Sequence, residues 1–330
     1  MYNASKFNPT GEFPPEFFEK KAVRRMANRI GFAVLALFAV MIGWSFLYFR
    51  ITAILGISTA DALSLTREPM FSQILQAVIS IFMTFLPFLV LIKSMYLKPA
   101  KIIPFGKPKN KLSGWFILGG IGFCLFASFA TDATRTIFQS FGFNYPATNT
   151  EQLTGILGFL IEVLLTACLP ALIEEFAMRG VVLGLLRPFG DGFAIICSSL
   201  VFGFMHATFL QIPFAFLVGL LLAIVTVKTD SIWPAVVIHA LNNFISVFFS
   251  YLNMYVGANK SNIIYTSFLC IALIISVIST VALLKRGEDT LKITPSNTAA
   301  SEKKKIAWFI TAPTVLISFL AALAIAYFLR

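Results

Sequence analysis

Charged residues are scarce in this chain of 330 residues, since only 12% of them are Asp, Glu, Lys or Arg while 58% are apolar. A soluble domain could not bury so much apolar surface, so the composition excludes the soluble globular classes. Cysteine is also rare, and its copies lie in apolar runs without the paired spacing of a metal knuckle or a redox motif. We expect these cysteines to be small packing residues. They are Cys124, Cys168, Cys197 and Cys270.

Several familiar signals are missing as well. The first apolar run begins only at residue 31 and has no cleavage pattern behind it, so we expect a signal anchor and not a cleavable signal peptide. No internal repeat and no glycine-rich phosphate loop is found, which leaves a transporter built from inverted halves without support. The net charge of +11 is spread along the chain instead of forming one basic face. We therefore expect no nucleic-acid partner.

Long apolar runs are what the sequence does contain. A helix needs about 20 apolar residues to cross the hydrocarbon core of a bilayer. The sequence therefore predicts an all-α polytopic transmembrane helical bundle of about nine spans, in contact with membrane lipid. The fourth run is too long for one simple crossing. The candidate spans are 31–49, 74–92, 114–131, 155–186, 192–209, 211–227, 233–256, 262–284 and 306–328.

Basic residues indicate the orientation of this bundle. If the N-terminus is cytoplasmic, all but five of the 26 Lys and Arg residues fall in segments on the inner side. This bias follows the positive-inside rule. It predicts a cytoplasmic N-terminus, an odd number of crossings and a C-terminus on the outer side. The five exceptions are Arg50, Arg67, Arg135, Lys260 and Arg330.

The chain divides into four parts by composition. Residues 1–30 mix Phe with basic residues, and we expect an amphipathic helix on the cytoplasmic membrane surface. Residues 31–153 hold the first three spans, and residues 154–256 hold the motifs described below. Residues 257–330 hold the last spans, with a polar and mobile cytoplasmic linker expected at 285–305.

Ionisable residues inside the spans are the unusual feature of this sequence. The stretch PALIEEFAMRGVVLGLL contains Glu174, Glu175 and Arg179, and the only two histidines, His206 and His239, also lie in apolar runs. Such groups are costly in a membrane helix and usually face a protein interior or a wet cavity. They are therefore the candidate site residues.

Spacing from the turns gives the expected depth of these residues. A turn is expected at RPFGD (187–191), which begins 13 residues after Glu174 and ends 15 residues before His206. At about 1.5 Å per residue both residues lie about 20 Å from that turn, so we expect them to face each other. His239 follows the next inner turn by nine residues, and Asn243 lies one helical turn further on the same face.

The two adjacent glutamates are expected to have different partners. Glu175 and Arg179 are four residues apart with the acid first, which is the favourable order for an ion pair within a helix. Glu174 points about 100° away from Glu175 on the same helix. We therefore expect Glu175 to neutralise Arg179 while Glu174 remains available for chemistry.

Each of these features also has a plainer reading. The charges at 174–179 could lie among the lipid headgroups after a span that ends at Ile173, although the apolar GVVLGLL that follows them argues against this. His206 could be a core histidine bonded to a carbonyl, and His239 with Asn243 could join helices through polar contacts. Their occurrence together at matching depths favours a functional site.

A carboxylate, two imidazoles and an amide are sufficient for peptide hydrolysis by activated water. A carboxylate in a cavity of low dielectric constant accepts a proton from water more readily, and an imidazole opposite can hold that water. Amide and imidazole N–H groups can donate to the oxyanion that forms. No Ser or Cys has a His/Asp partner at a motif spacing, so the sequence gives no support to a covalent nucleophile.

Three motifs on successive spans resemble those of a known family. EEFAMR fits EExxxR, FGFMH fits FxxxH and HALNN fits HxxxN. Over about 154–256 the chain resembles the CPBP intramembrane proteases, which include type II CAAX prenyl endopeptidases and bacterial bacteriocin-processing or self-immunity proteins. The resemblance implies an endopeptidase of a bacterial plasma membrane that acts on membrane-associated or lipidated peptides. Because the inferred site lies in the inner half of the bilayer, we expect it to open toward the cytoplasm.

The resemblance also implies a role for each residue. Glu174 would be the general base, His206 would help to orient the water, and His239 and Asn243 would donate to the oxyanion. The structural or accessory residues would be Glu175, Arg179 and Phe202. Zinc held by Glu174, His206 and His239 is the alternative. Because HExxH is absent and this ligand set would occupy the obvious base, we favour a mechanism without a cofactor.

Two functions of other classes stay open. The bundle could be a non-catalytic scaffold, such as a bacteriocin-immunity or regulatory protein of the same family. It could also be a proton-coupled carrier that uses Glu and His as relays. The carrier is less favoured, because the sequence shows neither repeat symmetry nor the signals of broken helices.

Overall fold

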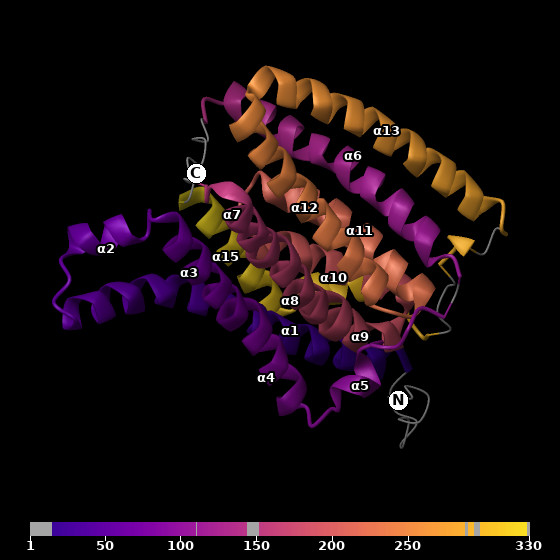
Figure 1. Ribbon diagram of the computed structural model, residues 1–330. Coiled ribbons are helices and arrows are strands. Elements are labelled where there is room, and N and C mark those ends of the chain that lie inside the picture. The colour runs from indigo at the N-terminus through magenta and orange to yellow at the C-terminus, as the bar shows by residue number, and fades with distance from the viewer. Residues whose placement is uncertain (1–14, 110, 144–151, 288–289, 294–297, 329–330) are drawn as a thin grey trace.

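The computed structural model describes residues 15–109, 111–143, 152–287, 290–293 and 298–328 (Figure 1). Within these ranges all long elements are helices, so the predicted all-α polytopic bundle is confirmed. The first elements are α1 (Pro15–Ile54), α2 (Thr59–Leu65), α3 (Pro69–Ser80), the π-helix η2 (Ile81–Phe85), α4 (Leu86–Ser94), α5 (Pro99–Ile102) and α6 (Ser113–Ser140). A continuous helical run follows, made of α7 (Gly155–Glu162), the π-helix η3 (Val163–Cys168), α8 (Leu169–Glu175), the π-helix η4 (Phe176–Val182), α9 (Leu183–Leu186) and the 3₁₀ turn η5 (Arg187–Phe189). The last elements are α10 (Asp191–Met205), α11 (Gln211–Thr229), α12 (Trp233–Val256), α13 (Ala258–Leu284), α14 (Glu302–Ile310) and α15 (Pro313–Phe328).

The number of spans is slightly lower than the predicted nine. Seven helices or helical runs in the described residues are long and apolar enough to cross a membrane, and the α14–α15 pair, bent by 66°, would be an eighth. The predicted span 192–209 corresponds to α10, which has 15 residues and ends at Met205. At about 1.5 Å per residue it is roughly 22 Å long, which is shorter than the hydrocarbon core of about 30 Å. Hydropathy overestimates the length of this helix because the turn that follows it, ATFL, is itself mostly apolar.

The N-terminal region differs from the expected surface helix. Residues 15–30 continue without a break into the first span, so that α1 is one helix of 40 residues. No proline lies within it after Pro15, and its two glycines do not interrupt it. The Cβ of an alanine at Gly31 would lie 2.4 Å from Oγ1 of Thr314, so the absence of a side chain lets α1 and α15 approach closely. Residues 1–14 of the predicted surface helix lie outside the described residues.

The expected polar linker at 285–305 is only partly a linker. Its last residues, from Glu302 onward, belong to α14. Lys305 is fully buried there, and its ammonium group donates to the backbone carbonyl of Phe189 and to Oγ1 of Thr298. A lysine in a polar stretch gives no sequence signal of burial, because the backbone carbonyl that accepts from it belongs to a turn 116 residues away.

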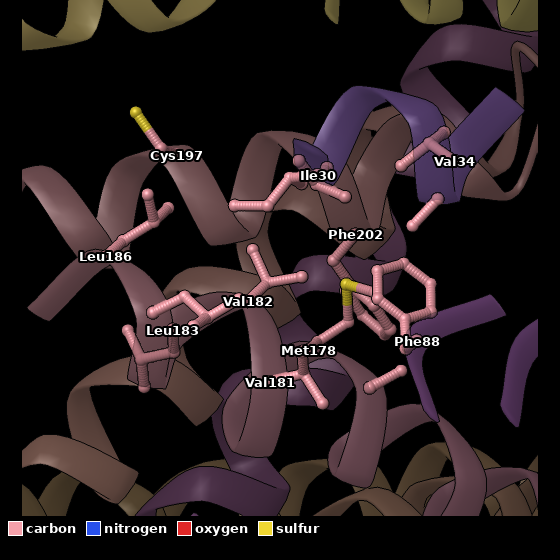
Figure 2. Packing of buried hydrophobic residues seen from close by; sticks show 14 of the residues in the cluster. Ile30, Val34, Phe88, Met178, Val181, Val182, Leu183, Leu186, Cys197 and Phe202 are labelled. Atoms are coloured by element: carbon pink, nitrogen blue, oxygen red, sulfur yellow. The ribbon is translucent and has the colours of Figure 1, made fainter. Parts of the chain in front are cut away.

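A packed apolar core surrounds the helical run that carries the two glutamates. Met178, Val181 and Val182 of η4 have no exposed surface. Figure 2 shows them beside Ile30 of α1 and Phe88 of α4. This packing fixes the run against helices from the N-terminal part of the chain, and close packing leaves its side chains little freedom to move.

Candidate active site

Glu174 and Glu175 lie on a short α-helical segment, α8, between two π-helical segments, η3 and η4. A π turn is wider than an α turn, is rare, and often occurs at functional sites. Pro170 at the start of α8 has no N–H to donate, which is consistent with the change of helix type at this point. The local sequence therefore places two adjacent carboxylates in an irregular stretch of a buried helix.

Glu175 lies at the centre of a buried ionic cluster. Its Oε1 atom accepts from Nη1 of Arg179 at 3.1 Å and lies 2.9 Å from Nδ1 of His239. The side chains of Glu175 and Arg179 are 0% and 1% exposed. The ion pair agrees with the predicted spacing of four residues, and it neutralises a guanidinium that would be very costly to bury alone.

Arg179 is held by two further contacts. Its Nη2 group donates to the backbone carbonyl of Gly219 on α11 at 3.2 Å. The guanidinium carbon also lies 4.4 Å from the ring centroid of Phe202, a cation–π contact. Arg179 thus joins α11 and α10 to the helical run that carries the glutamates.

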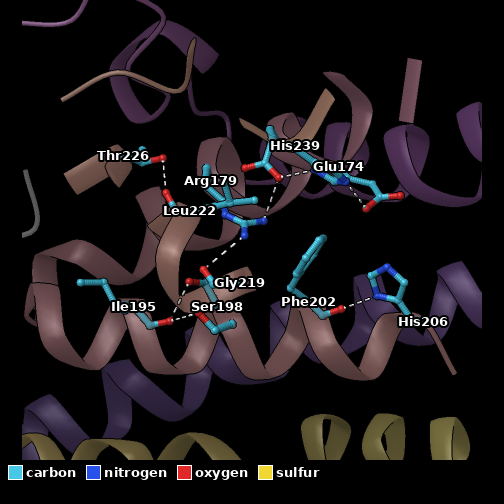
Figure 3. Close-up of polar contacts among 12 residues, drawn as sticks. Glu174, Arg179, Ile195, Ser198, Phe202, His206, Gly219, Leu222, Thr226 and His239 are labelled. Carbon is cyan, nitrogen blue, oxygen red and sulfur yellow. Dashed lines mark hydrogen bonds and ion pairs between the residues drawn. The ribbon is translucent and has the colours of Figure 1, made fainter. Parts of the chain in front are cut away.

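Glu174 points away from this ion pair, as expected. Its Oε2 atom lies 3.9 Å from Nε2 of His239, which is too far for a hydrogen bond. The same oxygen is buried and has no hydrogen-bond partner among the described residues. His239 therefore lies between the two glutamates, with Nδ1 bound to Glu175 and Nε2 facing Glu174 (Figure 3).

The hydrogen bond of His206 lies within its own motif, and the expected facing of His206 and Glu174 stays a prediction. His206 is the residue after the end of α10, and its Nδ1 atom lies 2.8 Å from the carbonyl oxygen of Phe202. A carbonyl only accepts, so Nδ1 carries the proton and Nε2 remains available. The ring of Phe202 packs edge-on against His206 at 5.0 Å and against His239 at 5.9 Å between centroids (Figure 3). The two histidines are thus connected through Phe202.

Asn243 lies one turn beyond His239 on α12 and belongs to the same region. Its Oδ1 atom accepts from Nδ2 of Asn242 at 3.2 Å. Both amides border a cavity of about 220 Å³ between α6, α11, α12 and α13. The structure therefore brings Glu174, Glu175, Arg179, Phe202 and His239 into mutual contact, and it places His206 and Asn243 at the edge of this group.

The zinc site that the sequence left open would need Glu174, His206 and His239 around one ion. In the part of the chain that the structure describes, no three His, Cys, Asp or Glu side chains are placed to ligate one ion. Nε2 of His239 and Oε2 of Glu174 face each other, but His206 is turned toward its own helix. A site made of these three residues would require His206 to move.

Sequence reasoning missed two contributions to this site. One is the hydrogen bond from His239 to Glu175, which joins the HxxxN motif to the EExxxR motif. The carbonyl of Gly219 lies in an apolar run that gives no polar signal. The one available signal was Gly219 itself, since glycine allows two helices to approach closely. A Cβ at this position would lie 3.2 Å from the ring of Phe202 and from Ser199, so α11 and α10 pack closely here.

Comparisons with known proteins agree with this arrangement. Residues 156–245 match the family described as type II CAAX prenyl endopeptidase Rce1-like. The chain is also 27% identical over 193 residues to the membrane-embedded CAAX protease MroQ of Staphylococcus aureus (strain USA300), an alignment that covers 55% of this chain and 77% of that protein. No solved structure matches the chain.

The matched region includes every residue of the three motifs, from EEFAMR to HALNN. It also contains the whole cluster around Glu175 and His239. The motifs, the convergence of Glu174 and His239, and the two similarities point the same way: over residues 156–245 this multi-pass membrane protein is similar to the type II CAAX prenyl endopeptidases.

Proposed function

We propose that this protein is an intramembrane endopeptidase that hydrolyses peptide bonds of membrane-associated or lipidated peptides with a water molecule activated by Glu174. The observation that carries the proposal is the gap between Glu174 and His239. A buried carboxylate oxygen without a partner lies 3.9 Å from an imidazole nitrogen, which is a separation that one water can bridge. Buried acceptors are rarely left unpaired unless a water or a substrate completes them.

The charges around this gap favour Glu174 as the base and His239 as the donor to the oxyanion. Glu174 and Glu175 bring two carboxylates to the site, and Arg179 brings one guanidinium. A protonated His239 would balance the remaining negative charge. Nδ1 of His239 then donates to Glu175, which leaves the Nε2–H group directed toward the gap as a donor for an oxyanion.

The reaction can be written with these groups alone. Glu174 takes a proton from the water while the water oxygen attacks the peptide carbonyl carbon. The resulting oxyanion accepts from His239 Nε2–H and from the Asn243 amide. When the tetrahedral intermediate collapses, the C–N bond breaks and Glu174 gives its proton to the leaving nitrogen, so that a carboxylic acid and an amine are released.

His206, whose ring packs against Phe202, orients the attacking water in this proposal. Its Nδ1–H is used by a carbonyl, so its Nε2 atom can accept a hydrogen bond from the attacking water. Glu175 and Arg179 hold His239 in place and do not themselves react. The similarity to the membrane-embedded CAAX protease MroQ supports the proposed substrate class and the bacterial plasma membrane. The distribution of basic residues supports a site that opens toward the cytoplasm.

Replacement of Glu174 tests the mechanism directly. Glu174→Gln keeps the size and polarity of the side chain but cannot take a proton from water, so cleavage should be lost while the protein remains folded. A comparison of peptide termini in membranes that contain the wild type or this variant would identify the products. Glu16→Gln, at an exposed ion pair near the N-terminus, is the matched control and should leave the products unchanged.

Three outcomes would count against this proposal. A Glu174→Gln variant that cleaves at the wild-type rate would rule out this mechanism. If cells retain the protein's biological role with Glu174→Ala and His206→Ala combined, the scaffold function is favoured. Stoichiometric zinc in the purified protein, with activity lost to a chelator and restored by zinc, would replace the metal-free mechanism by a metalloprotease.

A further inference from the structure

The amide of Asn243 can act in two opposite ways, depending on which of its ends faces the substrate. Its Nδ2 group donates two hydrogen bonds, whereas its Oδ1 atom only accepts them. As an oxyanion donor it must present Nδ2, because Oδ1 in the same place would repel the developing negative charge. The proposed function therefore requires that something fixes the direction of this amide.

The neighbouring residue provides such a constraint. Nδ2 of Asn242 donates to Oδ1 of Asn243 at 3.2 Å. Adjacent side chains on a helix normally do not face each other, so this contact is not a routine consequence of helix geometry. It occupies the oxygen of Asn243 and leaves the Nδ2 group of that residue to point elsewhere.

A cavity adjoins both amides. It has a volume of about 220 Å³, and none of its lining residues is charged. A cavity of about 150 Å³ can hold benzene, so this one has room for a peptide group with an adjoining side chain. Asn243, in the α12 wall of the cavity, lies one helical turn beyond His239, so this wall continues toward the ionic cluster.

We propose that Asn242 is a positioning residue, which holds the Asn243 amide with its Nδ2 group toward the carbonyl of an uncharged peptide segment in this cavity. The inference rests on the proposed function and deepens it. HxxxN leaves the position of Asn242 unspecified, so the motif gives this residue no role. The bound segment is uncharged at this point because no lining residue could neutralise a buried charge.

Two substitutions of Asn242 should differ in a way that only this role explains. Asn242→Ala removes the constraint and lets the amide of Asn243 rotate. Asn242→Asp has almost the same shape, but a carboxylate only accepts, so it attracts Nδ2 of Asn243 and turns Oδ1 toward the substrate. We expect kcat to fall about 10-fold in Asn242→Ala and about 100-fold in Asn242→Asp, with little change in KM, since loss of one oxyanion donor typically costs 10²–10³ in kcat.

The assay uses the purified full-length protein in lipid vesicles and the peptides whose cleavage depends on Glu174. Asn253→Asp is the matched control, because it makes the same change at an exposed position of the same helix, and it should keep wild-type kcat. Thermal unfolding of each variant shows whether the fold is retained. If Asn242→Asp does not fold, the comparison of Asn242→Ala with Asn253→Ala replaces it.

A double-mutant cycle separates positioning from a structural role. In an Asn243→Ala background no amide remains to be oriented, so Asn242→Asp should cause no further loss of kcat. An equal loss in both backgrounds, or an effect on KM alone, would overturn the inference. Wild-type kcat in Asn243→Ala would also overturn it while leaving the role of Glu174 intact, whereas the absence of any Glu174-dependent cleavage would remove both proposals.

Discussion

Nδ1 of His239 lies 2.9 Å from Oε1 of Glu175, and Nε2 of the same ring faces Oε2 of Glu174 at 3.9 Å. One imidazole therefore connects two carboxylates that are adjacent in sequence but differ in environment. Glu175 is completely buried in an ion pair, whereas the Glu174 side chain is 20% exposed. Glu175 is therefore held in place by its ion pair, whereas Glu174 lies where a water molecule can reach it.

Removal of the Glu175 carboxylate should strongly destabilise the protein. Glu175→Ala leaves Arg179 buried without its counter-ion, and breaking a buried pair in this way costs about 3–5 kcal/mol. Thermal unfolding in detergent measures the effect. Glu16→Ala breaks an exposed pair with Lys304, which contributes at most about 1 kcal/mol, and is the control. Equal decreases in Tm would contradict the structural role of Glu175.

Replacement of Phe202 should affect activity more than stability. Phe202→Leu removes the ring that contacts Arg179 and separates the two histidines, and misplacement of a reacting group by about 1 Å can cost 10²-fold in rate. Phe204 lies on the same helix, and its ring stacks against Phe319. Phe204→Leu therefore removes an aromatic contact away from the site. We expect similar Tm values for the two variants, with kcat reduced only in Phe202→Leu.

Two glycines should respond to alanine in opposite directions. In Gly122→Ala the new Cβ would lie 2.3 Å from Cβ of Ser276 and 2.7 Å from the carbonyl oxygen of Ala272, so α6 and α13 must move apart. Overpacking of this kind costs about 1–3 kcal/mol. Gly43→Ala meets no atom within 4 Å and should stabilise α1 by roughly 0.5–1 kcal/mol. A lower Tm for Gly43→Ala than for Gly122→Ala would contradict this packing.

Stability should fall in acid through Asp230, which lies in the turn between α11 and α12. Hydrogen bonds from Lys109 and from Arg187 hold the pKa of Asp230 below its usual value. A carboxyl group with a lowered folded-state pKa stabilises the fold above its unfolded pKa of about 3.9, and this contribution is lost as the pH falls through the folded value. Asp230→Asn should therefore have a lower Tm than wild type at pH 7, and the two curves should converge below about pH 4. A constant difference at all pH values would exclude this linkage.

The sequence was sufficient to predict the fold class and the pairing of Glu175 with Arg179. Apolar runs depend on composition, and the ion pair depends on a spacing of four residues on one helix, so both are local properties. The contact between His239 and Glu175 involves residues 64 positions apart. It depends on how α12 packs against α8, and no local pattern encodes that packing.

The expected facing of Glu174 and His206 rests on a constant rise per residue, which the helical run does not have. The depth of Glu174 was counted at a constant rise from the turn at 187–191, but the seven residues of η4 lie in that interval as a π-helix. A change from α to π turns alters both the rise and the direction of every preceding side chain. His206 lies beyond the last residue of α10, so its direction is set by a turn and not by the helix.

Burial of Lys305 has a mechanical consequence for the whole bundle. Its ammonium group has no exposed surface and is held by the carbonyl of Phe189, at the turn that joins the glutamate-bearing run to α10. Separating α14 from that turn would remove one acceptor of this buried ammonium group, so we expect the two to move together. A change in bilayer thickness that alters the tilt of the bent α14–α15 pair would therefore be transmitted to the turn beneath the glutamates.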